Sequence, residues 1–318
     1  MPHWKLILTY DGTPYNGWQV QPNLPTVQGT LAEAIHRITG ETVLPQGSGR
    51  TDAGVHALAQ VASFSLTVPI PAANLHRALN RALPASIRVL SVESVPADFH
   101  ARHSALRKTY EYRILPCGLS GDHDASADHD ARICSPMLAP YVWPCRYSLD
   151  LATLQQAATH ILGTHDFTSF AANDPDVTAR RKSPEAESAA LTRSSLQNLK
   201  SVISTEAEDS FTVRSEAERP PHFAGATTTP APTADAMTNI RTIHHSAWHQ
   251  QEELLIYRIT GSGFLHHMVR NLVGTFVEAA AHRISANEIP TILAARDRSA
   301  AGPTAPASGL FLVEVEYE

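Results

Sequence analysis

A turn rich in glycine holds the residues whose types and spacing are best suited to chemistry. Residues 47–64 read GSGRTDAGVHALAQVASF and place Asp52 two positions after Arg50. An arginine beside a carboxylate favours the ionised carboxylate, and small neighbours let a bulky substrate approach it. These are the conditions under which an aspartate acts as a nucleophile. The same spacing is also typical of an Asp-Ala-Gly turn closed by a side-chain hydrogen bond, so this alternative stays open.

A basic and aromatic segment, LRKTYEYR at residues 106–113, is the second candidate and is expected to form a strand. Alternation along a strand places Lys108, Tyr110 and Tyr112 on one face. For both tyrosines, ordinary core packing is the alternative to contact with a substrate. The basic residues of this region are Arg102, Arg107, Lys108 and Arg113. Such a cluster suits contacts with phosphates, although a solvated charged strand explains it equally well.

Arg270 lies in a predicted helix, among apolar residues that form a stripe along it. A lone arginine in such a stripe usually extends its charged end to solvent. The alternative is a buried charge that pairs with a carboxylate and thereby holds both groups in place. On the pattern alone, both arrangements remain open.

Seventeen histidines raise the question of a metal site. Two adjacent pairs occur, at residues 244–245 and 266–267, and adjacent residues do not share a helix face. Neither an HExxH motif nor a ligand spacing of cysteines and histidines is present in the sequence. We therefore expect no functional metal and no cofactor. His56, which follows the Asp52 turn, is expected to be a structural hydrogen-bonding residue rather than a base.

The overall composition limits the class of protein. The chain has 318 residues and a net charge of −6, which speaks against a uniformly basic nucleic-acid binder. The acidic excess falls in residues 118–132 and 174–238, so a local basic face elsewhere is compatible with it. Three cysteines without CxxC spacing suit a reducing compartment, and no unbroken apolar run reaches the 18 residues of a membrane span. We expect a cytoplasmic protein without a membrane segment.

Residues 118–132 and 174–238 are expected to be insertions, because polar compositions like theirs bury little. In the second of them, Ala, Ser, Thr and Pro fill 34 of 65 positions. Elsewhere, hydrophobic periodicity predicts strands at residues 5–9, 60–66, 87–95, 108–114, 253–259 and 310–317. It predicts helices at residues 27–39, around 75–82, and at 151–162 and 265–281, with Gly40 and Gly163 ending the first and third. Ser285 and Glu288 form a capping box that begins a last helix.

This order of elements predicts an α+β fold made of two ferredoxin-like βαββαβ halves, residues 1–105 and 106–318. The halves are expected to share a continuous, mainly antiparallel sheet with helices on one face. Joining the two sheets edge to edge hides two edge strands, which would otherwise remain unpaired. The face without helices is then expected to be available to a ligand.

Residues 49–56, GRTDAGVH, resemble the catalytic signature of the tRNA pseudouridine synthase A family. Four further segments resemble the same family in the same order, namely YDGTPYNGWQVQP, FHARHSALRKTYEYRI, GTHDFTSF and GSGFLHHMVRNLVGT, at residues 10–22, 99–114, 163–170 and 261–275. The closing segment, residues 296–317, resembles the family as well. The resemblance covers nearly all of the chain outside the two expected insertions.

The resemblance implies the pseudouridine synthase fold and an isomerase of the intramolecular transferase class. The implied reaction converts uridine to pseudouridine at positions 38, 39 and 40 in the anticodon stem-loop of tRNA, without metal or cofactor, in a homodimer. It implies Asp52 as the catalytic aspartate, Arg50 as its companion, and Arg270 as the arginine that pairs with it. Tyr110 matches the tyrosine that packs against the target uracil. With tRNA as the substrate, Arg107 and Lys108 become candidate substrate-binding residues.

The chemistry of this reaction agrees with a single carboxylate. Breaking the C1′–N1 bond builds positive charge at the anomeric carbon, which a nearby carboxylate stabilises or traps covalently. Uracil leaves as a delocalised anion and must not escape, so no second carboxyl is needed as an acid. The base must also leave its stack and be held on an aromatic face. Whether Asp52 attacks C1′ or the uracil ring is open.

Three classes of function compete for this sequence. The first is a tRNA uridine isomerase, for which Asp52 and Tyr110 are both present. The second is an RNA-binding module that keeps the fold without the chemistry. The third is a metal-dependent hydrolase built on the histidines, which would require metal in the purified protein.

Overall fold

The computed structural model describes residues 1–117, 133–172 and 239–318. The insertions predicted at residues 118–132 and 174–238 lie outside the described residues. Within the described part of the chain, no helix is long and apolar enough to cross a membrane.

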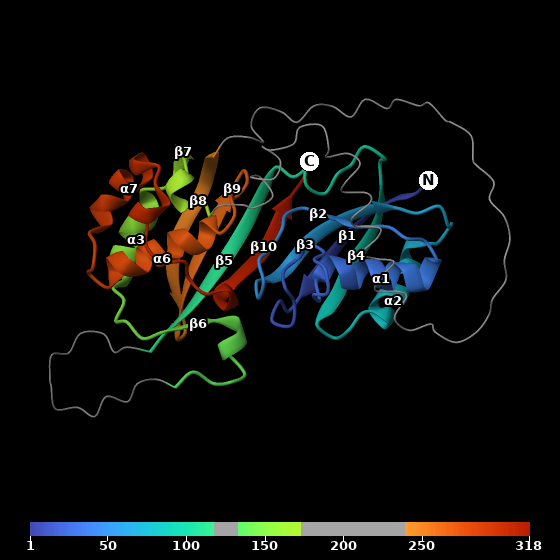
Figure 1. Ribbon diagram of the computed structural model, residues 1–318, viewed down its shortest axis with the longest axis horizontal. Helices are drawn as coiled ribbons and strands as arrows, with labels where there is room; N and C mark the ends of the chain where they lie inside the picture. Colours follow the sequence, from blue (N-terminus) through green and yellow to red (C-terminus); the bar gives the residue numbers. More distant parts are fainter. Residues whose placement is uncertain (118–132, 173–238) are drawn as a thin grey trace. The chain divides into compact units, whose positions relative to one another are not determined.

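One large sheet runs through the described residues, with the strand order β4-β1-β3-β10-β5-β9-β8-β7 (Figure 1). Its strands are β1 (His3–Tyr10), β3 (His56–Ser65), β4 (Ile87–Val95), β5 (Arg107–Pro116), β7 (Gly163–Asp166), β8 (Ile240–Gln251), β9 (Leu254–Gly261) and β10 (Leu310–Glu316). Two short strands, β2 (Gln46–Gly47) and β6 (Trp143–Cys145), pair with β3 and β5. The pairings are antiparallel except for β10 with β3 and β5 with β6. The predicted α+β class with a mainly antiparallel sheet is confirmed.

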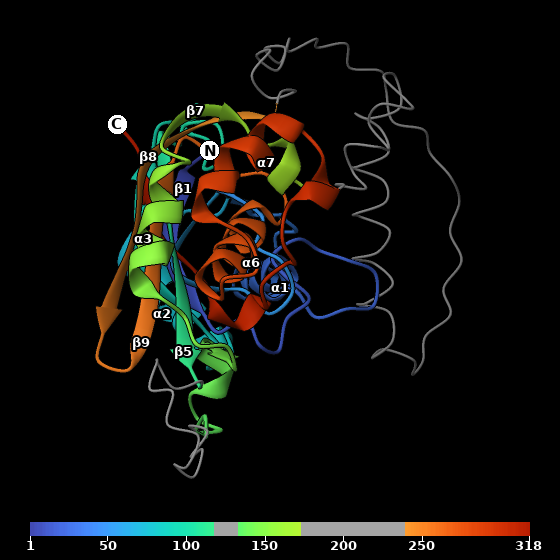
Figure 2. The same cartoon turned by 90° about the vertical axis from the view of Figure 1, so that its left-hand side faces the viewer.

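Five α-helices are described outside the strands, in two groups at the two ends of the sheet (Figure 1). They are α1 (Val27–Thr39), α2 (Ala72–Ala82), α3 (Leu151–Thr159), α6 (Met268–Ala280) and α7 (Ile289–Ala295). Figure 2 shows α1, α6 and α7 on the same face of the sheet. The helices cover that face because alternate side chains of the strands are apolar there, as in β1, where every second residue is buried.

The sequence explains where α1 begins and ends. The Thr26 side chain accepts a hydrogen bond from the backbone N–H of Gly29, which caps the N-terminus. Gly40 has φ 73°, a left-handed conformation that ends the helix at the predicted residue. Between the caps, the buried stripe includes Leu31 and Ile35, which belong to the hydrophobic core.

The central strand β10 joins the two parts of the sheet. It pairs antiparallel with β5 through residues 310–316. On its other side it pairs parallel with β3, where Phe311 lies opposite His56 and Leu312 opposite Ala57. Phe311 and Leu312 are buried, so the join is held by apolar packing as well as by backbone hydrogen bonds. The predicted edge-to-edge junction of the two sheets is therefore confirmed.

Three predicted boundaries were wrong for identifiable reasons. Helix α3 ends at Thr159 rather than at residue 162, because Leu162 is exposed and does not extend the apolar stripe. Helix α6 begins at Met268 rather than at residue 265, because His267 has a left-handed φ of 58°. The capping box of Ser285 and Glu288 is present, but it begins a 3₁₀ turn that leads into α7.

Candidate active site

The loop that carries Asp52 lies between β2 and β3 and is held in place by hydrogen bonds from buried polar side chains. The Ser48 hydroxyl donates to Gln60 Oε1 at 2.6 Å, and Gln60 Nε2 donates to the Gly49 carbonyl at 3.0 Å. Ser48 and Gln60 are fully buried. The Tyr10 and Thr51 hydroxyls share a further hydrogen bond of 2.8 Å. Because buried polar groups are strongly disfavoured without partners, these bonds hold the loop in one conformation.

Asp52 and Arg270 form the ion pair that was expected between them. Arg270 Nη1 donates to Asp52 Oδ2 at 3.0 Å, across 218 positions of sequence. The side chain of Arg270 is 15% exposed and that of Asp52 is 19% exposed, so the pair is largely shielded from water. Arg270 Nε also donates to the Ala305 carbonyl at 2.7 Å. Two acceptors fix the guanidinium, and the guanidinium in turn fixes one oxygen of the carboxylate.

The chain around Pro303 packs tightly on α6 and helps to position Arg270. A Cβ on Gly274, one turn after Arg270, would lie 1.7 Å from the Pro303 carbonyl oxygen. The Ala305 N–H donates to the Arg270 carbonyl at 3.1 Å, and the Gly302 N–H donates to the Thr275 hydroxyl at 2.9 Å. Only glycine at position 274 permits this close approach. The approach holds Arg270 next to the Ala305 carbonyl, which accepts its hydrogen bond.

His266 and His267 also face Asp52, which corrects the expectation drawn from their adjacency. His266 Nε2 lies 3.5 Å from Asp52 Oδ1, and His267 Nε2 lies 3.3 Å from Oδ2. The rule that neighbours do not share a helix face does not apply, because both residues precede α6. Burial lowers the pKa of His267, against the opposing effect of the Asp52 carboxylate. Sequence reasoning missed this pair, although Gly261 and Gly263 just before it indicate a late start of the helix.

Tyr110 and Lys108 lie against the Asp52 loop at Gly49. A Cβ on Gly49 would lie 3.9 Å from the Tyr110 hydroxyl and 3.5 Å from Lys108 Nζ. Tyr110 is buried, and its ring packs edge-on against Phe264 at 5.1 Å. Burial raises the pKa of Tyr110, so its phenol is neutral at pH 7. Phe264 is a second aromatic residue of the site that sequence reasoning missed.

Lys108 is a partly buried cation directed at the backbone of the loop. Its Nζ donates to the Ser48 carbonyl at 2.5 Å. Burial lowers the pKa of Lys108 to about 8, and the positive charges of Arg102 and Arg241 act in the same direction. Its ammonium therefore bonds the loop instead of extending into solvent.

The remaining candidates lie further from Asp52 or have another role. Arg50 belongs to the same loop and is exposed. Arg107 is exposed, and its Nη1 lies 3.9 Å from Glu316 on β10, so the structure does not bring it to the carboxylate. Tyr112 is fully buried and donates to the Pro306 carbonyl, as expected for core packing. His56 accepts from the Gly12 N–H at Nδ1 and bonds the Pro140 carbonyl through Nε2, which confirms a structural hydrogen-bonding residue.

The site lies on the face of the sheet that carries the helices, which corrects the expectation of a ligand on the opposite face. Gln60, which bonds the Asp52 loop, pairs with the buried Leu8 of β1 and so shares its face. Arg270 comes from α6, which covers that same face (Figure 2). The two helix groups lie at opposite ends of the sheet and leave the central strands between them (Figure 1).

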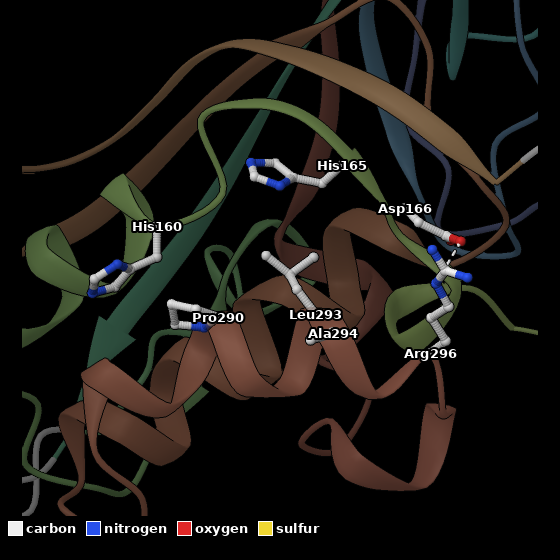
Figure 3. A pocket seen from close by; sticks show the side chains of 7 residues that line it. All are labelled: His160, His165, Asp166, Pro290, Leu293, Ala294 and Arg296. Atoms are coloured by element: carbon white, nitrogen blue, oxygen red, sulfur yellow. Dashed lines mark ion pairs between the residues drawn. The ribbon is translucent and has the colours of Figure 1, made fainter.

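A separate hollow of about 430 Å³ lies between α3, β7 and α7 (Figure 3). Its residues include His160, His165 and an ion pair of 3.1 Å between Arg296 and Asp166. The charges of Arg296 and Asp166 neutralise each other. Because it shares no residue with the Asp52 site, this hollow is not the candidate active site.

Fold and site together define a class of protein in which one aspartate is held by an arginine across the join of a two-part α+β sheet. The sequence model of a family described as tRNA pseudouridine synthase matches residues 6–104 and 222–318. The chain belongs to this family, and the resemblance found in its motifs is confirmed.

Relatives of nearly equal length agree with this assignment. A protein of Solibacter usitatus named tRNA pseudouridine synthase A is 40% identical over 314 residues, which cover 98% of both chains. A protein of the same name from Moorella thermoacetica is 36% identical over the whole of both chains. A third, from Acetivibrio thermocellus, is 34% identical over 98% of both.

Proposed function

We propose that the chain isomerises uridine to pseudouridine in tRNA, at positions 38, 39 and 40 of the anticodon stem-loop, with Asp52 as the nucleophile. Membership of the tRNA pseudouridine synthase family supports the reaction class. The observation that carries the proposal is the Asp52 carboxylate, held by Arg270 and presented on a rigid loop. A homodimer in the cytoplasm is part of the same proposal.

The arrangement suits breakage of a glycosidic bond. Arg270 occupies one oxygen of the carboxylate, so the other, Oδ1, is the oxygen we assign to the reaction. Asp52 is 19% exposed, which allows a nucleotide taken out of its stack to reach it. Two routes are open to the carboxylate: it stabilises or traps positive charge at C1′, or it adds to the uracil ring. Both routes require the carboxylate to be ionised.

The aromatic pair supports retention of the freed base. The Tyr110 ring lies beside the Asp52 loop and is braced edge-on by Phe264. Stacking on such a ring holds uracil while it turns from N1 to C5. The neutral phenol suits an uncharged contact with the base.

Three basic residues complete the proposal. We assign Arg50, exposed beside Asp52, to the flipped nucleotide. Arg107 is assigned to a phosphate further along the RNA, because its side chain is exposed at the end of β5. We assign to Lys108 a positive potential at the site. Its hydrogen bond to the Ser48 carbonyl also holds the loop.

Tritium release from tRNA labelled at C5 of uridine tests the proposal, with EDTA present. Wild type is expected to release tritium, and Asp52→Asn is expected to release none while its tRNA affinity stays within a few fold. Asp98→Asn, an exposed aspartate, is the matched control for the loss of one charge. Mapping of the modified positions then checks the anticodon stem-loop, and sedimentation analysis checks the dimer.

Two outcomes would overturn the assignment. Equal tritium release by wild type and Asp52→Asn would remove Asp52 from the chemistry. Binding of tRNA by wild type without any release would favour an RNA-binding module over an isomerase.

A further inference from the structure

Three metal-ligating side chains converge at the candidate active site from two distant parts of the chain. Asp52 comes from the loop after β2, and His266 and His267 come from the residues just before α6. One ligand atom from each lies within 4.8 Å of the other two. The two imidazole rings are 4.0 Å apart between centroids and direct both Nε2 atoms at the carboxylate.

The two distances from imidazole to carboxylate, one to each oxygen of Asp52, are longer than hydrogen bonds and close to the length of one edge of a metal-coordination polyhedron. The two Nε2–carboxylate separations are 3.5 and 3.3 Å, whereas N–H···O bonds are about 2.7–3.2 Å long. Two ligands about 2.0–2.1 Å from a tetrahedral zinc ion are about 3.3 Å apart. Because one ligand atom from each side chain lies within 4.8 Å of the other two, small side-chain rotations would bring all three onto one ion.

The donor set selects the class of ion. Two imidazoles and one carboxylate are ligands that Zn²⁺ and neighbouring first-row divalent ions prefer. Mg²⁺ and Ca²⁺ favour oxygen-rich sites. Three protein ligands leave the fourth tetrahedral position to a water molecule.

An ion can reach this site from solvent, and Arg270 limits how tightly it binds. The side chains of His266, His267 and Asp52 are 35%, 28% and 19% exposed. Arg270 occupies part of Asp52 Oδ2 and repels a cation nearby. We therefore expect weaker binding than at a structural zinc site, and an ion that exchanges with solution.

We propose that Asp52, His266 and His267 form a binding site for one divalent transition-metal ion of the Zn²⁺ class, and that the bound ion inhibits the enzyme. The ion coordinates the carboxylate and so withdraws the lone pair that attacks the nucleotide. It acts as an inhibitor and supplies no chemistry. The inhibition rests on the proposed function, whereas the binding site does not.

Direct titration of the purified protein tests the site. Co²⁺ is added as a spectroscopic probe, and Zn²⁺ affinity is measured by competition with a chromophoric chelator. We expect wild type to show the visible absorption of four-coordinate Co²⁺, which Zn²⁺ displaces. The double variant His266→Gln/His267→Gln should weaken Zn²⁺ binding by more than about 100-fold, because loss of groups that merely orient a ligand already costs about 10- to 100-fold.

A matched variant separates this site from other histidines. His244 and His245 form a second adjacent pair, exposed on β8. His244→Gln/His245→Gln should bind Co²⁺ and Zn²⁺ as wild type does. Asp52→Asn should also lose affinity, and circular dichroism checks that every variant is folded. Equal metal affinity in wild type and in folded His266→Gln/His267→Gln, or absence of binding in wild type, would overturn the site.

Tritium release tests the inhibition. Release by wild type and by His244→Gln/His245→Gln should fall as Zn²⁺ saturates the site and return when EDTA is added. Undiminished release at saturating Zn²⁺ would overturn the inhibition. Wild type that releases no tritium even with EDTA would instead refute the proposed function, and the Co²⁺ titration would still decide the site.

Discussion

Substitution of Gly274 by alanine should displace Arg270 from Asp52 without unfolding the protein. The added Cβ would lie 1.7 Å from the Pro303 carbonyl oxygen, whereas Cβ contacts of this kind stay at 3.0 Å or more. Helix α6 or the segment after Gly302 must therefore move by about 1.3 Å, the difference between these distances. If α6 moves, Arg270 moves with it, because it lies one turn away on the same helix face. If the segment after Gly302 moves, the Ala305 carbonyl that holds Arg270 is displaced instead.

The size of the effect follows from the bonds that cross this contact. Four hydrogen bonds join the two segments: Ala305 N–H to Arg270, Gly302 N–H to Thr275, Arg270 Nε to Ala305, and the Thr304 hydroxyl to Asn271 Oδ1. The first three involve backbone groups of the segment after Gly302, and their loss is worth about 3 kcal/mol, at about 1 kcal/mol each. The fourth joins two side chains, which can rotate to keep it. Alanine returns about 1 kcal/mol as a better helix former. The net loss of about 2 kcal/mol should lower the Tm by roughly 4 °C.

The effect on catalysis should be larger than the effect on stability. A displacement of about 1 Å at a catalytic group lowers the rate by about 100-fold. Tritium release at a temperature where Gly274→Ala is fully folded measures the loss of reaction rate. Thermal unfolding measures the loss of stability. Gly263→Ala is the stability control, because its Cβ would meet Arg241 at ordinary distances of 3.6 and 3.8 Å. A Gly274→Ala enzyme with the wild-type rate would refute the argument that this contact positions Arg270.

Two further predictions concern β5. Because burial lowers the pKa of Lys108 to about 8, from an ordinary 10.5, the folded chain releases this proton at a lower pH than the unfolded chain. The stability of wild type relative to Lys108→Met should therefore rise between pH 8 and 10 in urea unfolding, and a constant difference would contradict the burial of this ammonium. Tyr110→Ala should lower kcat/KM about 5- to 150-fold further than Tyr110→Phe, since base stacking is worth about 1–3 kcal/mol, and equal losses would exclude a stacking role.

Much of the fold could be predicted because local signals and tertiary packing agree. In α1, the cap at Thr26, the apolar stripe and Gly40 all indicate the same boundaries, which the structure confirms. Strand β8 was missed because its sequence, IRTIHHSAWHQQ, has polar residues at many positions. Its burial follows an irregular pattern, and the register with β9 shifts near His245, so no simple alternation marks it.

The candidate site could be predicted in part. The pair of Asp52 and Arg270 was expected from the resemblance to a family, whereas the apolar stripe around the arginine left pairing and extension to solvent both open. The contribution of His266 and His267 could not be deduced from spacing, because it depends on one left-handed residue. That residue is His267, which directly precedes α6, so the helical periodicity begins only at Met268. Left-handed φ is uncommon for any residue other than glycine, and a histidine alone does not predict it.

The place of β10 in the sheet also determines when during synthesis the two parts of the sheet can join. The Asp52 loop leaves the ribosome early, and Arg270 follows 218 residues later. Residues 310–316, which pair with both β3 and β5, emerge after both. For most of translation, a nascent chain therefore carries Asp52 without Arg270 and without strand β10, which joins the two parts of the sheet. A chain interrupted before residue 310 therefore lacks the strand that joins the two parts of the sheet, and in a chain interrupted before residue 270 Asp52 has no Arg270 to pair with.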